Sequence, residues 1–552
     1  MYMYIYFLVF NSIISLVISL LMMFYKQSFF FHWMAMSLNS FIMEFILFFD
    51  WISMIFVSLV SLISGFVLMY SIYYMEGDFT LDRFFYLVLL FVFSMYLMIL
   101  SPNILSVLIG WDGLGLVSYG LIIYYQSWKS FNSGMVTVLM NRIGDVGILM
   151  MIGLLMAKGS WNLMFYFNSM NLIIMFLILS SCTKSAQLPF SVWLPLAMAA
   201  PTPVSSLVHS STLVTAGVYL MIRFNMFLMD FGSKYLLMIS SFTMFMAGFV
   251  ANFENDLKKI IALSTLSQLG LMMSILSLGE VMMGFFHLVM HALFKSLLFM
   301  CSGIIIHLML NNQDIRFMGS LIKFYPFVGL MFFFSSLSLC GLPFLSGFYS
   351  KDLIMESFLM KKINYFSLIM IFMSTMFTVS YSIRLINLVY INDLNKLNCM
   401  CLKNEDFYMV LSMLILFFFS IFGGYIFMNL FFFIEKVIIL KFFEKVFVLM
   451  VCTFGIWFGW WISFKEFSFS LYEKVFLNKM FGLEFILNCI YEKVIFISLI
   501  YYKIDKGFIE FIQISGLKKK FLLMMNFFQI DIMFLNKIMT YFVFLIFLSI
   551  CF

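Results

Sequence analysis

The sequence predicts an all-α polytopic membrane protein with about fifteen transmembrane helices. Of its 552 residues, 64% are hydrophobic and 11% are charged, whereas soluble globular domains carry about 25% charged residues. Charge-free runs such as Trp51 to Met75 and Phe324 to Ser350 recur along the chain, and each is long enough to cross a bilayer. These runs are apolar on all sides instead of alternating, which favours helices over the strands of a barrel.

Composition and charge argue against several classes of partner. The net charge of +6 is spread along the chain, with no dense basic cluster beyond Lys518 to Lys520, so nucleic acid is not an expected partner. The eight cysteines are scattered through apolar segments and form neither a disulfide framework nor an iron–sulfur binding pattern. We therefore expect no cofactor and no metal ion in this chain.

Amino-acid usage indicates the genetic origin of the chain. Phe, with 76 residues, and Met, with 51, are very frequent, and both have A/T-rich codons. The N-terminus enters an apolar run at once, without the basic start of a signal peptide or an Arg-rich transit peptide. We expect a protein encoded by an organelle genome, with no import from the cytosol.

The first seven spans are expected between residues 1 and 224. A pair of transmembrane helices near 2–25 and 51–75, joined by a loop with Trp33 and Glu44, forms the N-terminal segment 1–83. Five more make up a first five-helix repeat, 84–224. These five are expected near 84–101, 103–125, 134–156, 171–199 and 204–224.

Proline interrupts the fourth span of this repeat. Residues 185–222 contain no Asp, Glu, Lys or Arg, and as one straight helix they would extend about 57 Å, nearly twice the ~30 Å hydrocarbon core of a bilayer. Prolines remove backbone donors and clash with the preceding turn. The four in this run are Pro189, Pro195, Pro201 and Pro203. We expect two helices here, the first of them broken, with Lys184 at the break.

A second five-helix repeat is expected over 235–390. Its clearest spans lie near 257–278, 281–308 and 320–360. The last of these is also broken, because Gly341, Pro343 and Gly347 disrupt the helix shortly before Lys351. Two sets of five spans, each with an interrupted fourth member, form the pattern expected of internal repeats.

The chain changes character after residue 390. Additional transmembrane spans are expected near 407–433 and 445–463, within a segment 391–463. From 464 to 530, charges recur every several residues among aromatics, which favours a long lateral amphipathic helix along the membrane interface or against partner subunits. The last apolar run, 531–552, contains two charged residues, Asp531 at its start and Lys537. It can form a C-terminal transmembrane anchor.

Three ionisable residues form a predicted stripe on one helix. His287, His291 and Lys295 are spaced i, i+4 and i+8, which stacks them over about 12 Å of one helix face. Histidine titrates near neutrality, and such a stripe can pass protons. A zinc site is the rival interpretation, but Leu288 stands where the H-E-x-x-H motif needs glutamate. A purely structural polar stripe is the second alternative.

Other ionisable residues lie inside predicted spans, where a charge costs at least about 2.5 kcal/mol and needs a partner or water. They are Asp112, Lys184 and His209 in the first repeat, and Lys351 and Asp352 in the second. Buried ion pairs or capped half-helices are the structural alternative for each of them. Arg142 and Asp145 are spaced i, i+3 and could simply neutralise each other, or Asp145 could join the relay.

Five motifs resemble one known family. They are WDGLG at 111–115, NRIGDVG at 141–147, TKSAQLPFSVWLPLAMAAPTPVSSLVHSSTLVTAGVYL at 183–220, HALFKSLLF at 291–299 and GFYSKD at 347–352. Together they resemble the antiporter-like membrane subunits of respiratory complex I, the NADH:ubiquinone oxidoreductase, most closely its subunit 5 branch. The resemblance covers roughly residues 50 to 390, and the charged C-terminal stretch resembles the lateral helix of that branch.

The resemblance implies two inverted repeats and a hydrophilic axis at mid-membrane that translocates protons. Asp112 would stand in for the family's usual glutamate and pair with Lys184. His209 and Lys295 would bridge the two halves, and Lys351 would be the terminal lysine. Electron transfer, with flavin and iron–sulfur clusters, would occur in partner subunits.

The resemblance also implies a location and partners for the chain, and the sequence differs from the family pattern in two respects. The expected location is the mitochondrial inner membrane, with membrane lipids and neighbouring antiporter-like complex I subunits, contacted by the lateral helix, as partners. Asp112 is one methylene shorter than glutamate, so its pairing with Lys184 would need water or closer helices. The N-terminus has one span fewer than is usual. The rival functions are a cation/proton antiporter subunit of the same fold and a non-transporting structural subunit.

Overall fold

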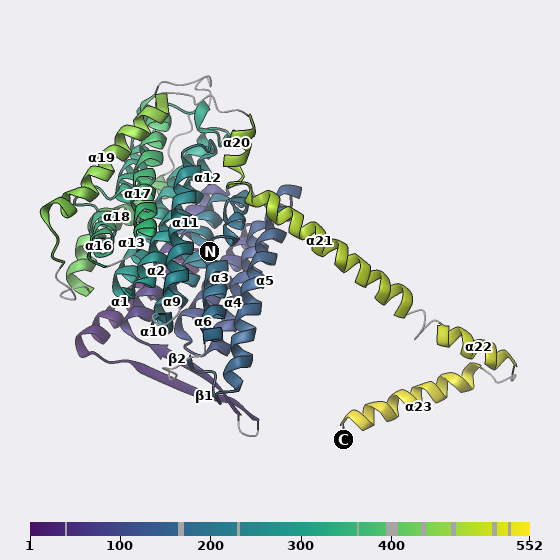
Figure 1. The fold of residues 1–552 in the computed structure, drawn as a ribbon. Coiled ribbons are helices and arrows are strands. Elements are labelled where there is room, and N and C mark those ends of the chain that lie inside the picture. The colour runs from purple at the N-terminus through teal and green to yellow at the C-terminus, as the bar shows by residue number, and fades with distance from the viewer. Residues whose placement is uncertain are drawn as a thin grey trace. The chain divides into compact units, whose positions relative to one another are not determined.

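The computed structural model is almost entirely helical and divides into two compact units, 1–481 and 482–552. It describes residues 1–38, 41–163, 171–228, 232–361, 364–392, 407–431, 438–464, 471–509, 516–527 and 532–551. In the first unit, the long helices lie side by side along a common direction, and a two-stranded hairpin lies at one end of the bundle (Figure 1).

The N-terminal segment contains two packed helices and the hairpin. Helix α1 (Tyr2–Tyr25) packs against α2 (Trp51–Tyr74), as predicted. Between them, β1 (Phe29–Leu38) and β2 (Phe41–Phe49) pair antiparallel, with Phe29 opposite Phe49. The prediction of a loop here was wrong. Residues 29–49 are rich in Phe and Ile, which favour strands. This short segment between two spans has no apolar pattern with the period of a helix, so nothing favours a helix over the two strands.

The first five-helix set begins with three unbroken helices. They are α3 (Leu81–Leu100), α4 (Ile104–Ile122) and α5 (Trp128–Met156). The Asn103 side chain accepts a hydrogen bond from the Leu105 amide at the start of α4, and Ser127 and Ser130 form a capping box at the start of α5. Helices α3 and α4 begin within three residues of their predicted positions, whereas α5 begins six residues before the predicted 134.

The fourth span of this set is broken, as predicted. Helix α6 (Asn171–Lys184) ends at the lysine, and three short helical pieces follow after Pro189. They are η2 (Phe190–Val192), α7 (Trp193–Leu196) and η3 (Ala197–Ala199). The fifth span runs unbroken over Thr202–Arg223. It comprises α8 (Thr202–Val204), the π-helical η4 (Ser205–Thr212) and α9 (Leu213–Arg223), and the short α10 (Asn225–Leu228) follows it.

The second set repeats the break in its fourth span. Its members are α11 (Ser233–Ala251), α12 (Leu257–Ser277), α13 (Val281–Leu308), α15 (Pro326–Cys340) with α16 (Ser346–Met360), and α17 (Tyr365–Ile386), which continues into η6 (Asn387–Ile391). Two short pieces, η5 (Ile315–Phe317) and α14 (Leu321–Phe324), precede α15. Helix α15 ends at Gly341, whose φ of 84° is a left-handed conformation that glycine adopts readily.

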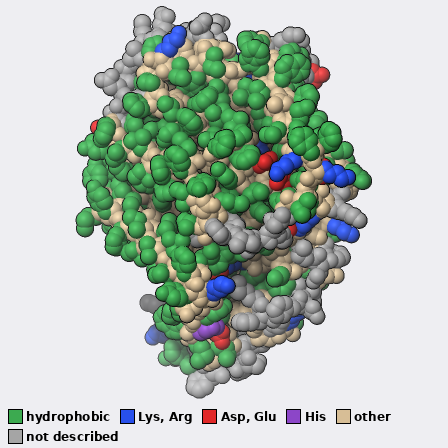
Figure 2. Space-filling view, turned by 90° about the vertical axis from the view of Figure 1, so that its left-hand side faces the viewer, with side chains coloured by type: hydrophobic (Ala, Val, Ile, Leu, Met, Phe, Trp, Pro, Cys, Tyr) green, Lys and Arg blue, Asp and Glu red, His purple; other side chains and the backbone are tan. Residues whose placement is uncertain are grey.

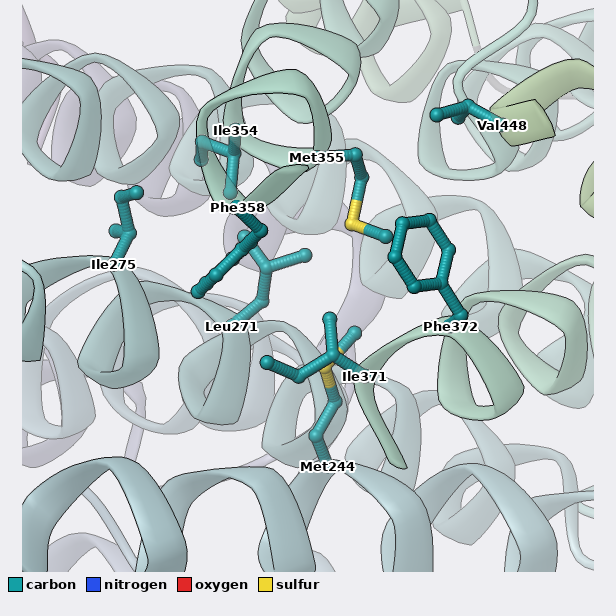
Figure 3. Close-up of a cluster of buried hydrophobic side chains, with 9 residues drawn as sticks. All are labelled: Met244, Leu271, Ile275, Ile354, Met355, Phe358, Ile371, Phe372 and Val448. Carbon is teal, nitrogen blue, oxygen red and sulfur yellow. The ribbon is translucent and has the colours of Figure 1, made fainter. Parts of the chain in front are cut away.

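Apolar side chains from five helices hold the second set together. Met244 of α11, Leu271 of α12 and Ile371 of α17 are fully buried in one cluster with residues of α16 and α19 (Figure 3). Phe358 of α16 points into the same cluster and is also fully buried. Burying a side chain of this size contributes about 1.5 to 3 kcal/mol relative to exposure in water. The cluster thereby fixes α16, the half-helix that carries Lys351, against α12 and α17.

The remaining helices follow after residue 406. Helices α18 (Phe407–Phe431) and α19 (Phe442–Phe464) agree with the two predicted spans, and α20 (Leu471–Asn478) follows. The second unit contains α21 (Leu483–Lys503), which continues as η7 (Ile504–Ile509), then α22 (Leu517–Phe527) and α23 (Ile532–Cys551). The expectation of one long helix over 464–530 was too simple, because α20 and α21 are separate elements, while 465–470, 510–515 and 528–530 lie outside the described residues. Left-handed backbone at Met480, Phe481 and Gly482 ends the helical path between α20 and α21.

The helices suit a membrane. Among the described residues, twelve helices are long and apolar enough to cross a bilayer, and four shorter apolar helices accompany them. Three of the shorter ones belong to the two broken spans, so the total agrees with the predicted number of about fifteen. Figure 2 shows a face covered mainly by hydrophobic side chains with few charges, as expected of a surface in contact with lipid. The all-α polytopic membrane fold is confirmed.

Candidate functional site

Two carboxylates share one arginine at the first end of the candidate axis. Arg142 Nη1 lies 3.0 Å from Asp145 Oδ2, one turn along α5, and 3.5 Å from Asp112 Oδ1 on α4. Gly110 on α4 lies against the backbone of Met98 on α3, where a Cβ would come within 2.7 Å of a main-chain atom. This close helix approach is typical of small residues in membranes. The pairing of Arg142 with Asp145 that the spacing allowed is present, and Asp112 joins it.

Lys184 lies at the end of α6 and is completely buried. Its Nζ donates a hydrogen bond to the carbonyl oxygen of Trp111 at 3.1 Å and lies 4.7 Å from the centroid of the Trp111 ring. A cation over an indole face is stabilised by roughly 0.5 to 2 kcal/mol. Trp111 precedes Asp112, so the lysine is held by the backbone and the aromatic ring of the residue next to its expected partner.

The direct pair of Asp112 and Lys184 is therefore not formed. The nearest cation to the Asp112 carboxylate in the described part of the chain is Arg142, and Lys184 is held instead by the Trp111 carbonyl. The physical reason lies in the two cations: a guanidinium presents five donors in a fixed fork and can serve two carboxylates, whereas an ammonium is a point charge. The short aspartate reaches the guanidinium and does not extend to the lysine.

His209 lies in the π-helical segment η4 and is completely buried. Single π-helical turns inside helices are frequent at functional sites. In the described part of the chain, neither ring nitrogen has a hydrogen-bond partner, and the ring centroid lies 6.2 Å from that of Trp193. Trp193 Nε1 in turn donates to the Thr183 carbonyl at 3.0 Å. Trp193 thus lies between His209 and the residue that precedes Lys184.

The predicted stripe on α13 is present and buried. His287, His291 and Lys295 are at most 1% exposed, and the two imidazole centroids are 6.3 Å apart. His287 Nδ1 lies 3.0 Å from Ser350 Oγ, and its Nε2 lies 3.1 Å from Gln268 Oε1. At the other end of the stripe, Lys295 Nζ donates to a hydroxyl of α12, Ser264 Oγ.

Lys351 occupies the second helix break. Its Nζ donates to Thr378 Oγ1 of α17 at 2.8 Å and lies 3.4 and 3.5 Å from the carbonyl oxygens of Cys340 and Leu339. These carbonyls are the unpaired acceptors at the C-terminal end of α15, which carries partial negative charge and favours a cation. Ser350, the neighbour of Lys351, contacts His287, so this lysine and the α13 stripe belong to one polar cluster.

Asp352 is a more peripheral member of the same region. It interacts electrostatically with Glu356 and Lys351 on α16 and with Lys445 on α19. Lys445 is exposed, whereas Lys351 is 5% exposed. Asp352 is therefore within electrostatic reach of both the buried lysine and a charged surface residue.

The predicted site residues fall into two clusters with His209 apart from both. Asp112, Asp145 and Lys184 gather around Arg142 and Trp111, whereas His287, His291, Lys295 and Lys351 gather around α13. Within the described chain, His209 has no direct hydrogen bond to either group. Reasoning from the sequence missed the uncharged partners of these groups. They are Trp111, Ser264, Gln268, Ser350 and Thr378; Trp111 and Ser350 lie in the motifs WDGLG and GFYSKD, but nothing in the spacing of the five marks them as partners of the ionisable residues.

The described residues contain no group of three or more His, Cys, Asp and Glu side chains placed to hold a metal ion. The polar groups of the site are instead dispersed along several helices, each with hydroxyl, carbonyl or indole neighbours. Dispersed ionisable groups of this kind suit the movement of protons and do not form a coordination shell.

Three family descriptions match consecutive parts of the chain. Residues 33–85 match the N-terminus of chain 5 of the NADH-ubiquinone oxidoreductase (complex I). Residues 101–378 match the transmembrane family of NADH:quinone oxidoreductase and Mrp antiporters. Residues 381–552 match the C-terminus of NADH dehydrogenase subunit 5. The central match contains every predicted site residue.

Individual relatives agree with these matches. NADH-ubiquinone oxidoreductase chain 5 of Aedes aegypti is 50% identical over 86% of this chain and 83% of its own, and that of Locusta migratoria is 47% identical over 90% of each. Among solved structures, the Mrp complex from Dietzia sp. DQ12-45-1b superposes with a TM-score of 0.77 at 21% identity, over 95% of this chain and 62% of that one. This last likeness concerns the fold alone.

Proposed function

Because the chain belongs to the family of NADH-ubiquinone oxidoreductase chain 5, we propose which of its residues carry protons through the membrane. As a member, it is a proton-pumping membrane-arm subunit of the respiratory complex I enzyme. The identity of about half to chain 5 relatives favours this function over a cation/proton antiporter subunit or an inert structural subunit. We propose that Asp112, Lys184, His209, Lys295 and Lys351 are the main proton carriers.

The observation that carries this proposal is the position of two buried lysines at helix breaks. Lys184 ends α6, and Lys351 binds the open carbonyl end of α15. A charge inside the membrane is costly and is expected to have a function. Broken helices with polar backbone ends are also the sites where transporters hold ions. Neither lysine has a carboxylate in direct contact in the described residues, so a change of local field can shift its proton affinity.

The first step of the proposed mechanism takes place around Trp111. When Lys184 leaves the Trp111 carbonyl for Asp112 or Asp145, its charged form gains a carboxylate; when it returns, that stabilisation is lost. Arg142 competes for the same two carboxylates. A shift of this ion-pair network, driven by electron transfer in partner subunits, would make Lys184 bind or release a proton.

The later steps use the second cluster. A proton would pass through His209 to Lys295, then along His291 and His287, and through Ser350 to Lys351, with Asp145 and Asp352 as lesser members. Hydroxyls and imidazoles can each accept one proton while donating another. Moving one charge across 100 mV requires about 2.3 kcal/mol.

The rest of the proposal concerns the location of the chain and its partner subunits. We place the chain in the mitochondrial inner membrane, encoded by the organelle genome, with membrane lipids around it. Flavin and iron–sulfur clusters would lie in partner subunits and not in this chain. The helices within 464–530 would contact neighbouring antiporter-like subunits, with 531–552 as an anchor. Their exposed apolar residues, such as Phe496 and Tyr501, support a role in contacts with lipid or protein.

The test measures proton pumping per NADH oxidised by the assembled complex in vesicles. Replacing Lys184 or Lys351 by Met removes the titratable amine while keeping an apolar stem, and pumping should fall. Lys129→Met is the matched control, because Lys129 is exposed at the start of α5. Pumping by the Lys351→Met complex equal to that of the control would disprove the assignment.

A further inference from the structure

A second polar column lies outside the proposed axis, between α2, α13 and the start of α8. The rings of Tyr70 and Tyr74 on α2 stack with centroids 5.5 Å apart, and the Tyr74 ring lies 5.8 Å from that of His307 on α13. The Tyr70 hydroxyl donates to the Met300 carbonyl at 3.3 Å and is completely buried. His307 is only partly buried. The column therefore leads from a partly exposed imidazole to a buried phenol.

Thr202 adds a hydroxyl to the inner end of this column. It is completely buried and contacts both Tyr70 and Tyr74. In the described part of the chain, its Oγ1 nevertheless has no partner with the geometry of a direct hydrogen bond. A buried hydroxyl that lacks such a partner costs roughly 1 to 3 kcal/mol, so a transient partner is expected.

Gly303 brings these hydroxyls together. A Cβ on Gly303 would come closer than 3.0 Å to both the Tyr70 hydroxyl oxygen and Thr202 Oγ1. The two hydroxyls therefore lie over the same point of α13, where only a residue without a side chain leaves them room. An alanine would push at least one of them away.

A buried cation lies beside Thr202, at the connection from Ala200 to Thr202 between η3 and α8, which we call the hinge. Lys258 of α12 is 6% exposed, and its Nζ donates to the Ala200 carbonyl at 3.2 Å. Within the described residues, it forms no ion pair within 4 Å. Ala200 ends the broken fourth span, and Thr202 begins the helix that carries His209. A buried ammonium whose one hydrogen-bond partner in the described part of the chain is a carbonyl is costly and suggests a function.

The outer end of the column has an acidic neighbour. Asp78, in the turn after α2, interacts electrostatically with Tyr74 and accepts a hydrogen bond from the Tyr125 hydroxyl at 3.4 Å. Asp78 and His307 are both partly exposed. They can therefore exchange protons with the water at this side of the membrane.

From these contacts we propose a side relay for protons, formed by His307, Tyr74, Tyr70 and Thr202. It connects the surface near Asp78 with the hinge at Ala200 and Lys258, and so with the helix that carries His209. His307 takes up a proton at the outer end on one ring nitrogen and releases one from the other, each hydroxyl accepts a proton on its oxygen while its own proton passes inward, and the amine form of Lys258 receives the proton at the inner end. The side relay deepens the proposed function, on which it rests.

The test compares variants that keep the packing and remove only the relay. Tyr70→Phe deletes one hydroxyl, and Thr202→Val replaces a hydroxyl by a methyl of similar volume. Gly303→Ala separates the two hydroxyls, and Gly153→Ala is its control, because a Cβ at Gly153 meets nothing within 4 Å. Each relay variant should lower pumping per NADH in the assembled complex and alter the ratio of pumping rates in H₂O and D₂O, whereas Gly153→Ala should leave both unchanged.

Two controls keep failures distinguishable. NADH oxidation with an artificial electron acceptor shows whether each complex has assembled, and Lys351→Met is measured in the same vesicles. If Lys351→Met lowers pumping while Tyr70→Phe and Thr202→Val pump like Gly153→Ala with an unchanged isotope ratio, the side relay is overturned and the axis remains. If Lys351→Met has no effect, the proposed function itself fails.

Discussion

Lys184 is held by a carbonyl oxygen and an aromatic face, and this changes how its charge can be controlled. A carboxylate in contact would fix the ammonium form, whereas the Trp111 carbonyl at 3.1 Å provides one hydrogen bond and little charge. The two nearby carboxylates are held by Arg142 at 3.0 and 3.5 Å. The observed arrangement is therefore the separated member of the proposed pair of states.

Lengthening the carboxylate at position 112 tests this interpretation. Asp112→Glu adds one methylene, so the carboxylate can reach Lys184 while Arg142 keeps Asp145, and pumping should be retained. Asp112→Asn removes the charge and should lower pumping, up to the roughly 10²-fold that a positioned proton-transfer group contributes. Pumping per NADH distinguishes them; equal values for Asp112→Asn and the unmodified complex would contradict the role of this carboxylate.

A partly buried ion pair outside the axis predicts a pH dependence of stability. Arg223 donates to both Asp50 oxygens at 2.6 and 2.7 Å, and Asp50 caps α2 through the Ser53 amide. Burial raises the pKa of Asp50, but the hydrogen bond and charge of Arg223 together with Ser53 outweigh it and hold the pKa below its ordinary value of 3.8. The stabilisation is therefore complete above pH 3.8 and is lost as the pH falls through the lower pKa of the folded state.

Asp50→Asn isolates this contribution. Leaving the partly buried Arg223 cation without its carboxylate should reduce the free energy of unfolding, by less than the about 3 to 5 kcal/mol of a fully buried pair. Melting temperatures measured from neutral pH to below pH 3.8 should show a smaller loss on acidification in the variant. Asp82→Asn, on the first turn of α3, is a comparison outside this ion pair; the same acid dependence in all three proteins would contradict the assignment to Asp50.

At the level of elements, hydrophobic run length and proline position predict the spans well. Helix α1, α2, α13 and both broken helices begin and end within a few residues of their expected positions, because a bilayer imposes one length on every span. The hairpin at 29–49 was not predicted, because no such length rule applies outside the hydrocarbon core. The ionisable residues of the proposed site could also be singled out in the sequence, since charge is rare in membrane helices.

The partners of those residues depend on packing between helices distant in sequence. Trp111 and Lys184 are in contact although 73 positions separate them in the sequence, and Lys351 and Thr378 are in contact across a separation of 27 positions. The apolar sequence of a membrane helix does not indicate which of its faces packs against which neighbouring helix. Helix breaks could be placed from the sequence, whereas the choice of Arg142 over Lys184 as the partner of Asp112 depends on atomic distances.

The break between α15 and α16 makes a prediction of its own. Gly341 has φ of 84°, and its amide donates to the Leu337 and Ser338 carbonyls at 3.2 Å, which leaves the Leu339 and Cys340 carbonyls for Lys351. Gly341→Ala should cost about 1 to 2 kcal/mol for the left-handed backbone and disturb the position of Lys351. Pumping should fall with NADH oxidation by an artificial acceptor intact.

The control for Gly341→Ala is Gly423→Ala in α18, where the nearest atom to an added Cβ is 3.8 Å away, at ordinary contact distance. That variant should pump normally. Normal pumping by Gly341→Ala as well would mean that the carbonyl end of α15 does not position Lys351 for function.

At the scale of the whole molecule, the question is whether the two clusters act in one series. The cluster around Arg142 and the cluster around α13 lie in different five-helix sets, and His209 stands between them in the proposed order. Distant residues without shared partners usually have additive effects on stability, within about 0.5 kcal/mol. Coupling between them in pumping must then come from the proton route itself.

A double-mutant cycle with Lys184→Met and Lys351→Met measures that coupling. If protons pass both lysines in series, the double variant should pump no more slowly than the slower single variant, because either block already stops the flow. If the lysines serve separate routes, the logarithms of the two losses should add. Lys184→Met combined with Lys129→Met provides the additive reference. Pumping rates per assembled complex decide the outcome, and strict additivity for the two buried lysines would divide the proposed axis into two independent routes.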